Sequence, residues 1–589
     1  MKRYISNIDF RLCKMKRFFS ITIFLIIAIS LAGFEPQWEW GVTLSSFNDF
    51  PTGKMVNDSE GNLYITGSFN LTLDFGPHSL EAAGAYDHEI ISSKRDVYVA
   101  KLDTDGNWCW ATRIGGEEED FSFNIAIDSN DNIYITGCLD KVNLDPSSLP
   151  PHNYHSDLFV AKLDSDGNVL WKRRTEGAGD NEGHSIVIDS NDNVYIVGSF
   201  SGDIDFGIIE LTSYPMNMSI IAKLDTDGDW LWVREFNEKS IGMVDRKALL
   251  SIDQNDKLTI AGLFHDTVNF GQFSITAQGF WNDIYIAGIN PEGEWLWIRQ
   301  ISQIEPDEYW GHLSLRNITA DRKGNIILLG AYNGIVDFGN TYLTSDSNTS
   351  IDRDFFLASL DPQKGWNWIR KLARDREDSS SQLHLLDVAT DRFSNLYITG
   401  SYSSTLTLGD IVLDGDSSTY LFLAKGDPLG NWLWAERSYG WYYSYGISIA
   451  VDRRNTIFLR GSFDGQIELG SLVLTSDIFQ FASHFYAKLR VKDSEVVVPS
   501  HYVINYPNPF NPLTTFLLSM HFDDHVKLKI YNIKGQRVVT ILDEYREAGV
   551  HRIVWDGRDA AGDIITSGVY LYILSSKSQK ITGKMTLMK

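Results

Sequence analysis

A hydrophobic line with alternating side chains recurs along the middle of the chain, and such alternation over short runs is typical of β-strands. The clearest copies lie at residues 62–69 (NLYITGSF), 132–137, 193–200 and 395–401, with weaker copies at 258–262, 326–330 and 457–461. Each copy carries one glycine, and these seven glycines are spaced 61 to 70 residues apart: Gly67, Gly137, Gly198, Gly262, Gly330, Gly400 and Gly461. The middle of the chain is therefore predicted to be an internal repeat of strand units.

A second marker is a tryptophan near the end of each unit, again seven in number: Trp40, Trp110, Trp171, Trp232, Trp297, Trp368 and Trp434. The two series are out of phase, because Trp40 precedes the first glycine and no tryptophan follows the last glycine until Trp555. A linear stack has no reason to begin within a unit, whereas in a ring the first strand can complete the last sheet. The pattern predicts a radial propeller, whose closure hides sheet edges.

Each unit fits four strands. In the second unit we expect strands at 123–127, 133–139, 157–163 and 169–173, with polar turns at 128–132 and 164–168. The seventh unit supplies three strands, ending at 485–489, and residues 37–41 are expected to add its fourth. The predicted fold class is all-β: a seven-bladed β-propeller with three-plus-one strand closure, followed by a small Ig-like β-sandwich.

Residues 36–492 resemble the bacterial seven-bladed propeller repeats of exported proteins. The line from Ala222 to Trp232 (AKLDTDGDWLW) is also similar to the tryptophan docking line of quinoprotein propellers. That resemblance implies that the tryptophan wedges between neighbouring blades. The quinone cofactor does not carry over, because no catalytic set of that family is recognisable in this chain.

The C-terminal segment reads as a separate module. Residues 493–500 are expected to form a linker, and residues 501–589 a β-sandwich with strands at 526–532, 537–542, 551–555, 568–574 and about 583–588. Three prolines, Pro507, Pro509 and Pro512, exclude helix and central strand and predict an extended lead-in. The propeller is expected to occupy residues 34–492.

The tail is similar to the C-terminal sorting domain of type IX secretion substrates, and to the Ig-like domain of flagellar hook-capping proteins. The matching pieces lie at 506–512 (YPNPFNP), 526–535, 548–551, 555–557, 567–572 and 584–589. The resemblance implies transport across the inner membrane by the Sec route and then across the outer membrane. It implies the type IX machinery as a partner, and removal of the tag with release or surface anchoring of the cargo.

The N-terminus reads as an export signal. Lys14, Lys16 and Arg17 precede an apolar run at 18–31, and Ser30-Leu31-Ala32 is a small-x-small cleavage pattern. The run is too short to span a bilayer as a mature helix. We interpret residues 1–33 as a signal peptide, with Met15 as an alternative start and a buried core helix as the competing interpretation. No transmembrane segment is expected in the mature chain.

The formal net charge of the chain limits the classes of binding partner to be expected. The 589 residues carry a formal charge of −25, whereas residues 501–589 hold 11 Lys and Arg against 8 Asp and Glu. The propeller is therefore strongly acidic, and a protein that binds nucleic acid needs a basic face, so nucleic acid is not an expected partner. The shift of charge also supports a domain boundary near residue 500.

Several local motifs suggest chemistry but recur with the fold. Residues 74–76 and their copies at 205–207 and 337–339 read Asp-Phe-Gly, like a kinase metal-binding motif, and residues 269–271 read Asn-Phe-Gly. A motif present in several blades belongs to the fold, and the other kinase motifs are missing. The Asp-x-Asp-Gly lines at 103–106, 164–167 and 225–228 fit hairpin turns, with opportunistic calcium binding as the alternative.

Two histidine groups and two cysteines complete the candidates. His152, His155 and Asp157 offer potential metal ligands, as do His521, Asp523, Asp524 and His525, but neither set has zinc spacing, so a polar loop and a solvated hairpin are preferred. Three cysteines are too few for a disulfide framework. Cys109 and Cys138 are expected to be buried free thiols, with a disulfide between them as the alternative.

No catalytic, cofactor-binding or metal-binding residue is assigned, because Gly-x-Ser-x-Gly, His-Glu-x-x-His and phosphate-loop motifs are missing. The sequence favours a non-enzymatic propeller, secreted or on the outer-membrane surface of a Gram-negative-type bacterium, that serves as a binding, adhesion or scaffold module for an extracellular glycan or protein. The alternative is a carbohydrate-active hydrolase or lyase on the same fold. Converging carboxylates or a His-Tyr-Arg group at one channel mouth would favour that enzyme.

Overall fold

The structure is a computed structural model, and it shows β-strands without helices in the residues it describes. Those residues are 37–44, 53–83, 94–116, 118–140, 156–177, 179–236, 248–279, 281–304, 312–345, 353–372, 382–416, 418–440, 443–476, 483–490, 501–506, 510–520, 524–546, 549–577 and 580–588. The all-β class is confirmed. The chain separates into two compact units, of which Pro36–Val491 is one and Lys492–Lys589 belongs to the other.

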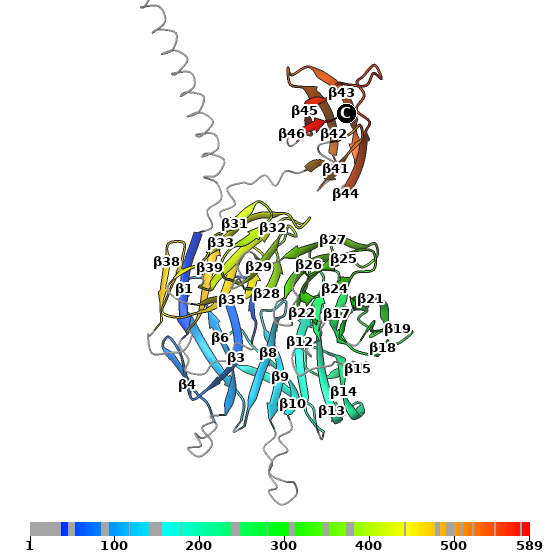
Figure 1. Cartoon of the computed structure of the whole chain (residues 1–589). Coiled ribbons are helices and arrows are strands. Elements are labelled where there is room, and N and C mark those ends of the chain that lie inside the picture. The colour runs from blue at the N-terminus through cyan, green and yellow to red at the C-terminus, as the bar shows by residue number, and fades with distance from the viewer. Residues whose placement is uncertain are drawn as a thin grey trace, which may run out of the picture. The chain divides into compact units, whose positions relative to one another are not determined.

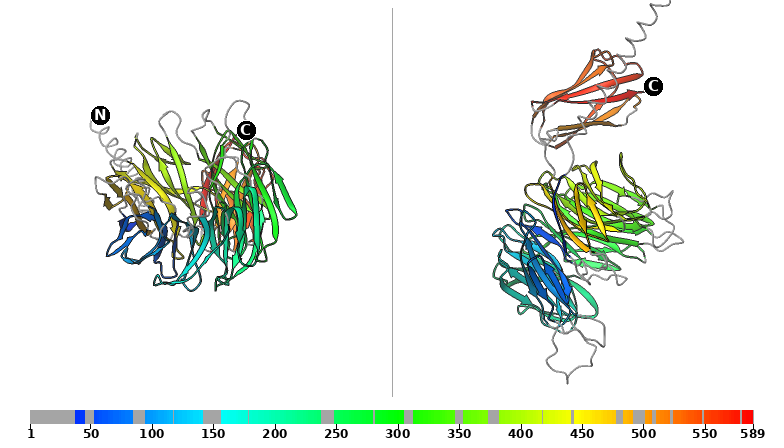
Figure 2. Two further views of the ribbon diagram at one scale, coloured as in Figure 1. Left: turned by 90° about the horizontal axis from the view of Figure 1, so that it is seen from below. Right: turned by 90° about the vertical axis from the view of Figure 1, so that its left-hand side faces the viewer.

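The described part of the first unit contains seven antiparallel sheets, here called blades 1 to 7, and each blade has four main strands of its own (Figures 1 and 2). Blade 1 contains β2 (Met55–Asn57), β3 (Leu63–Asn70), β6 (Arg95–Leu102) and β7 (Trp108–Ile114). Blade 2 contains β8 (Asp120–Ile127), β9 (Ile133–Asp140), β10 (Ser156–Leu163) and β11 (Val169–Arg174). Blade 3 contains β12 (Asn181–Ile188), β13 (Val194–Asp205), β14 (Glu210–Leu224) and β15 (Trp230–Phe236).

The next three blades follow the same order. Blade 4 contains β16 (Leu249–Ile252), β17 (Leu258–Phe264), β20 (Asp283–Ile289) and β21 (Trp295–Ile304). Blade 5 contains β22 (His312–Ala320), β23 (Ile326–Asn333), β26 (Asp354–Asp361) and β27 (Gly365–Leu372). Blade 6 contains β28 (Leu383–Thr390), β29 (Leu396–Tyr402), β32 (Tyr420–Gly426) and β33 (Trp432–Arg437). The strands of the second unit of the repeat begin up to three residues before, and end up to one residue after, the predicted ranges.

Blade 7 joins the two ends of the first unit. It contains β35 (Ser444–Val451), β36 (Thr456–Phe463), β39 (Ser483–Arg490) and, as its outer strand, β1 (Gln37–Leu44). β1 pairs antiparallel with β39 from Gln37 opposite Arg490 to Leu44 opposite His484 (Figure 1). The innermost strands touch their neighbours in cyclic order, β2, β8, β12, β16, β22, β28 and β35, and β35 again touches β2.

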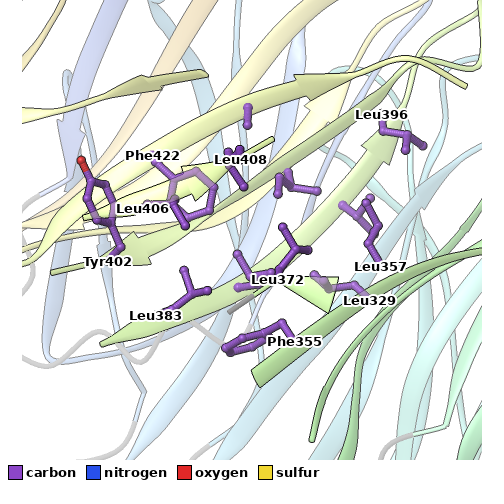
Figure 3. Close-up of a cluster of buried hydrophobic side chains, with 14 of the residues drawn as sticks. Leu329, Phe355, Leu357, Leu372, Leu383, Leu396, Tyr402, Leu406, Leu408 and Phe422 are labelled. Carbon is purple, nitrogen blue, oxygen red and sulfur yellow. The ribbon is translucent and has the colours of Figure 1, made fainter. Parts of the chain in front are cut away.

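The packing follows from the hydrophobic pattern. The two middle strands of each blade are covered on both faces, and β10 and β23 are buried along their whole length, which explains their nearly continuous apolar runs. The outer strands alternate instead. The core lies between neighbouring blades: Figure 3 shows side chains of blade 5, such as Leu357, against side chains of blade 6, such as Phe422.

A hydrogen-bonded latch joins most neighbouring blades. The marker tryptophan of one blade donates its indole N–H to a carbonyl in the turn between the third and fourth strands of the next blade, at 2.9–3.1 Å, in the pairs Trp40–Thr104, Trp110–Ser165, Trp171–Thr226, Trp232–Pro291 and Trp368–Pro428. A lysine of the third strand reaches the same carbonyl in four of these places. At the junction of the chain ends, Trp40 and Lys488 both donate to Thr104.

The latch between blades 6 and 7 lacks its acceptor. Trp434 is buried, and its indole nitrogen has no hydrogen-bond partner among the described residues. The reason is topological. In blade 7 the third strand is β39 and the fourth is β1, so these two strands are not joined by a turn that could offer a carbonyl.

The Asp-Phe-Gly copies lie in short hairpins between the second and third strands, such as β4 (Thr72–Phe75) with β5 (His78–Glu81). Their phenylalanines pack edge-on against the first tryptophan of the fourth strand, with Phe75 and Trp108 ring centroids 5.0 Å apart. Their glycines, Gly76, Gly207, Gly271 and Gly339, have positive φ. The motif is therefore part of the fold, as expected, although the hairpins themselves were not predicted.

The C-terminal unit is a sandwich of two sheets. One contains β40 (His501–Tyr506), β41 (Thr514–Met520) and β44 (Gly549–Trp555), and the other β43 (Arg537–Arg546), β42 (Asp524–Asn532), β45 (Gly568–Ser575) and β46 (Lys580–Leu587). Alternating residues of β42 enter a core that includes Phe516, Trp555 and Tyr572. The strands β40 and β41 were not predicted from the sequence, because the prolines between them indicated an extended lead-in.

The predicted signal peptide lies outside the described residues. Among the residues that are described, no helix is long and apolar enough to cross a membrane.

Candidate functional site

The propeller has two rims with different chemistry. We call the end at which the innermost strands begin the start rim, and the opposite end, where the first strand turns into the second, the turn rim. At the turn rim Asp58 accepts the backbone N–H groups of Glu60 and Asn62, the side-chain amide of Asn62 and the hydroxyl of Tyr64. Burial and the charge of Asp58 raise the pKa of Tyr64, so the phenol remains a donor.

The same arrangement recurs around Asp128, Asp189 and Asp391. In these four blades the lysine of the third strand lies over the tyrosine ring, as Lys101 does over Tyr64 at 4.9 Å. These repeated aspartates, tyrosines and lysines are thus bonded or packed within the repeat.

The Asp-x-Asp-Gly lines are hairpin turns. Asp103 accepts the backbone N–H groups of Asp105 and Asn107 and the side-chain amide of Asn107, and Gly106 takes a positive φ. Although burial opposes it, the bonds from Asn107 lower the pKa of Asp103. Within the described ranges no group of three or more His, Cys, Asp or Glu side chains is arranged to hold a metal ion. The first aspartate of the line is thus bonded within the turn.

The histidine groups are only partly described. His152, His155, His521 and Asp523 lie outside the described residues. Asp157 is buried and accepts a bond from Arg174 at 2.5 Å. Asp524 accepts the backbone N–H of His525, whose ring lies 3.5 Å from Asp543. The described members therefore serve local structure.

Cys109 and Cys138 are free thiols, so the disulfide alternative is wrong. Cys138 is buried as predicted, but Cys109 is exposed. The reason is the alternation of β7: Trp108 and Trp110 face the neighbouring elements, and the residue between them points to the opposite face, as the half-exposed Leu170 and Leu231 do in later blades.

We expect one thiol of the chain lacking residues 1–33 to react with a disulfide reagent in the native state, and a second only after unfolding. Partial desolvation and the charge of Asp103 raise the pKa of Cys109, so its reaction should accelerate as the pH rises. The measurement is a thiol titration with and without denaturant. Cys109→Ser should remove the native-state reaction, and two reactive thiols in the native state would contradict the structure.

A polar hub centred on a buried carboxylate connects the innermost strands. Asp387 of β28, with a side chain 3% exposed, accepts bonds from Lys54 Nζ at 3.0 Å, from Ser448 Oγ at 2.6 Å and from the Asn317 amide. These donors come from blades 1, 7 and 5. A carboxylate of blade 6 therefore ties together four blades, and we call these four residues the hub.

Carboxyl groups gather at the start rim of blades 1 and 2. Asp96 and Asp120 are both 1% exposed and both approach the backbone at Gly115. Asp120 accepts the N–H groups of Gly116 and Asp140, yet burial raises its pKa to about 7. Burial and the charge of Glu119 raise the pKa of Asp140 to about 6. The carboxylates converge, but Asp96 and Asp120 are enclosed by protein and bonded to it.

We expect Asp120→Asn to change how stability depends on pH. In the parent, the folded carboxyl binds its proton more tightly than the unfolded one, so this group lowers stability as the pH rises from about 4 to about 7. Each unit of pKa shift corresponds to about 1.4 kcal/mol. The free energy of unfolding of the variant, measured in urea, should rise relative to that of the parent by on the order of 2–4 kcal/mol between pH 5 and pH 8. The control Asp105→Asn, at an exposed side chain, should show no such change with pH. An equal difference at both pH values would contradict the assignment.

Basic groups gather on the start rim of blades 5 and 6. His312 begins β22, Arg316 follows on the same strand, Arg353 directly precedes β26, and His384 lies on β28. Burial, Arg353 and Arg316 lower the pKa of His312 to about 4. Desolvation and the same two guanidinium groups lower the pKa of His384. We call these four residues the basic cluster.

A tyrosine stands beside the basic cluster. Tyr445 precedes Gly446, which pairs with the marker Gly461, and His384 precedes Leu385, which pairs with the marker Gly400. The two residues thus hold equivalent positions on β35 and β28, which touch. Arg316 is the bulged residue of β22, one position beyond Leu315. His384 is exposed and Tyr445 is 37% exposed. Three neighbouring blades therefore place a histidine, a tyrosine and an arginine near the start-rim ends of their innermost strands.

None of these rim residues was singled out from the sequence. The residues belong to different blades, and no local motif connects them. The sequence offers only a positional signal. In each unit one residue of the first strand pairs with the marker glycine, and the residues next to it come together at the start rim when the units are aligned.

Comparison with known proteins supports the two-part architecture. Residues 110–137 match the family model described as "Beta-propeller repeat", and residues 520–580 match that of the FlgD Ig-like domain. An uncharacterised WD repeat-containing protein, L264, of Acanthamoeba polyphaga mimivirus is 23% identical over 503 residues, which cover 72% of this chain and 36% of that protein. The chain thus spans about a third of the length of this relative.

Two solved structures are also similar. An ulvan lyase of a new polysaccharide lyase family, bound to -[GlcA(1-4)Rha3S]-, is 12% identical, with 71% of this chain and 93% of that chain covered and a TM-score of 0.37. PorZ, a surface component of the type IX secretion system of Porphyromonas gingivalis, is 12% identical, with 93% and 100% covered and a TM-score of 0.16. At these scores the likenesses carry no argument about function.

Proposed function

We propose that this protein is an exported β-propeller that binds an extracellular glycan at its start rim. The observation that supports this most directly is the difference between the two rims. The repeated aspartates, tyrosines and lysines of the turn rim, such as Asp58, Tyr64 and Lys101, interact within the repeat, whereas His384 and Tyr445 are exposed at the start rim and break the repeat pattern. Binding surfaces on propellers are expected where loops and strand ends meet the channel.

A glycan array with the chain from residue 34 onward tests the proposal. We expect binding to at least one polysaccharide class, and we expect Tyr445→Ala to abolish it without lowering the melting temperature. Tyr342→Ala, at a side chain 59% exposed on β25 (Tyr342–Thr344), is the matched control. Binding that survives Tyr445→Ala would place the site elsewhere.

A carbohydrate-active enzyme is the second candidate. The specific observation in its favour is the set of His384, Tyr445 and Arg316 on adjacent innermost strands. In a lyase, an arginine would neutralise a uronate carboxylate, and a histidine or tyrosine would exchange protons with the sugar. A lyase would generate unsaturated products that absorb ultraviolet light, and a hydrolase would release reducing ends. Degradation of a bound polysaccharide by the parent, and its loss in His384→Ala, would favour the enzyme over the binding module.

We further propose that the C-terminal unit serves export by a type IX system. Its support is the separate core of this unit, the family match at 520–580 and the net positive charge of residues 501–589 beside an acidic propeller. Deleting residues 501–589 in the native host should retain the propeller in the periplasm. A tail-less chain that still reaches the cell surface would refute the sorting role.

A further inference from the structure

The turns between the first and second strands use some of their five positions for the fold and leave others free. Each turn begins with an aspartate that accepts the backbone N–H groups of the third and fifth residues, as Asp58 does from Glu60 and Asn62. The same two bonds form around Asp321 in blade 5 and around Asp452 in blade 7. Because the third residue contributes its backbone N–H, the turn places no demand on its side chain.

These free positions change their charge around the ring. At the second and third positions blades 1 to 4 carry no basic residue, and blade 1 carries Glu60. Blades 5 to 7, which are neighbours and run from green to yellow in Figure 1, carry exposed basic residues there. We call these residues the basic side of the turn rim: Arg322, Lys323, Arg392, Arg453 and Arg454.

A second set of turns changes at the same place in the ring. Because the strands of a blade alternate in direction, the turn between the third and fourth strands also lies at the turn rim, and Thr104 of this turn neighbours Gly61 in blade 1. Its third residue is an exposed acid in blades 1 to 4, but Gln363 or Leu429 in blades 5 and 6. Together with Glu60, these acids form the acidic side of the turn rim: Glu60, Asp105, Asp166, Asp227 and Glu292.

The side chains of the basic side are available to a partner. Within the part of the chain that the structure describes, none of them forms an ion pair; Arg322 donates to Gln254 Oε1 at 3.3 Å, and Arg392 lies 4.7 Å from the ring centroid of the exposed Phe393. The fourth turn position gives the reason. In blades 2 to 4 it holds an aspartate that accepts bonds from the preceding blade, whereas blades 5 to 7 hold Gly324, Ser394 and Asn455 there.

We infer that the turn rim is a contact surface for a second copy of this chain, related to the first by a twofold axis that lies in the plane of the rim, between its acidic and basic sides. Such an axis turns one rim over onto the other, so the acidic side of each copy faces the basic side of its partner. A twofold contact uses the same surface on both copies, and a surface with one half of each sign is complementary to itself. A uniformly acidic or basic partner would match one side and be repelled by the other.

The contact depends on salt, because it rests on exposed charges. At 0.1 M salt the Debye length is about 10 Å, so facing groups attract each other while the net negative charges of the two chains are largely screened. At 1 M salt the Debye length is about 3 Å, and the attraction is lost. The start rim lies at the opposite end of the propeller, so the inference is independent of the proposed glycan site.

Sedimentation velocity of the chain from residue 34 onward tests this inference. We expect a monomer–dimer equilibrium in 0.1 M salt and a monomer in 1 M salt. Lys323→Glu with Arg392→Glu should weaken the dimer by about 10- to 100-fold, because each substitution occurs twice in a twofold contact and replaces attraction by repulsion. The matched control is Lys172→Glu with Arg299→Glu, which makes the same change of charge on the outer strands β11 and β21 and should leave the dimer unchanged.

A mixture of two variants distinguishes this contact from any other. Glu60→Lys with Asp166→Lys reverses charge on the acidic side and should also weaken self-association. Mixed with Lys323→Glu and Arg392→Glu, it should restore pairing, because each reversed side then faces a side that is reversed in the opposite sense. Folding should be kept, since Lys323 stands at the turn position where blade 1 carries Glu60, and melting temperatures check this.

Three results would overturn the inference: a parent that stays monomeric at every concentration in 0.1 M salt, a dimer that the control variant weakens equally, or a mixture that does not pair. A monomeric parent that binds polyglutamate, and loses it in Lys323→Glu with Arg392→Glu, would instead assign the basic side to an acidic partner.

Discussion

Deletion of β1 is expected to unfold the whole propeller and not only its seventh blade. This strand pairs along its length with β39, buries Leu44 and donates the Trp40 indole to Thr104 of blade 1. Loss of one large buried side chain costs about 3–5 kcal/mol, against a usual stability of about 5–15 kcal/mol. The deletion would also leave β39 as an unpaired edge. Thermal unfolding followed by circular dichroism should show the cooperative transition lost or lowered by more than about 10 °C.

Glu39→Gln is the control for that deletion. It keeps the strand but removes the ion pair between Glu39 and Lys488, whose atoms lie 3.0 Å apart near the surface. Such pairs contribute about 0–1 kcal/mol, so the melting temperature should change little. A β1 deletion that melts at the parent temperature would show that closure by this strand does not hold the ring together.

Replacing Asp387 by alanine is expected to destabilise the propeller by about 1–3 kcal/mol, because the donors of Asn317 and Ser448 lose their acceptor, whereas Lys54, with a side chain 32% exposed, can turn to solvent. Lys54, Asn317 and Ser448 would each lose an acceptor. Ser448→Ala removes one neutral donor to the hub, and its expected cost is about 1 kcal/mol. Chemical unfolding in urea measures both.

The double variant Lys54→Met with Asp387→Leu distinguishes the ion pair from simple packing. Removing both charges leaves no uncompensated carboxylate or ammonium, so the double variant should be more stable than Asp387→Ala. If the two are equally unstable, the cost lies in side-chain volume and not in charge. If Asp387→Ala is as stable as the parent, the hub does not tie the blades together.

The strands were predictable because their signals are local. An alternating run, a polar turn and a marker glycine lie within about ten residues of one another, so Ile133–Asp140 differs from its expected range by one residue. The offset between glycines and tryptophans also anticipated the pairing of β1 with β39. The short outer hairpins were not predicted, because strands of three or four residues such as Thr72–Phe75 carry too few alternations.

The hub and the rim were not predictable from local pattern. Lys54 and Asp387 are 333 residues apart in sequence, and each stands in a stretch that reads as ordinary strand or turn. His384 and Tyr445 occupy equivalent positions but differ in type, so a search for repeated residues passes over them. Residues that serve the fold repeat from blade to blade, whereas residues that serve a single site do not.

The missing acceptor of Trp434 shows that the seam of the ring is set by connectivity and not by the blade sequences. A circularly permuted chain, in which a turn of the Asp-x-Asp-Gly kind joins β39 to β1, would supply Trp434 with the carbonyl that Ser165 gives to Trp110. New ends opened in the turn between β10 and β11 would in turn leave Trp110 without its acceptor. The unsatisfied indole would then move with the break, and its position could be assigned to any blade junction by choice of chain ends.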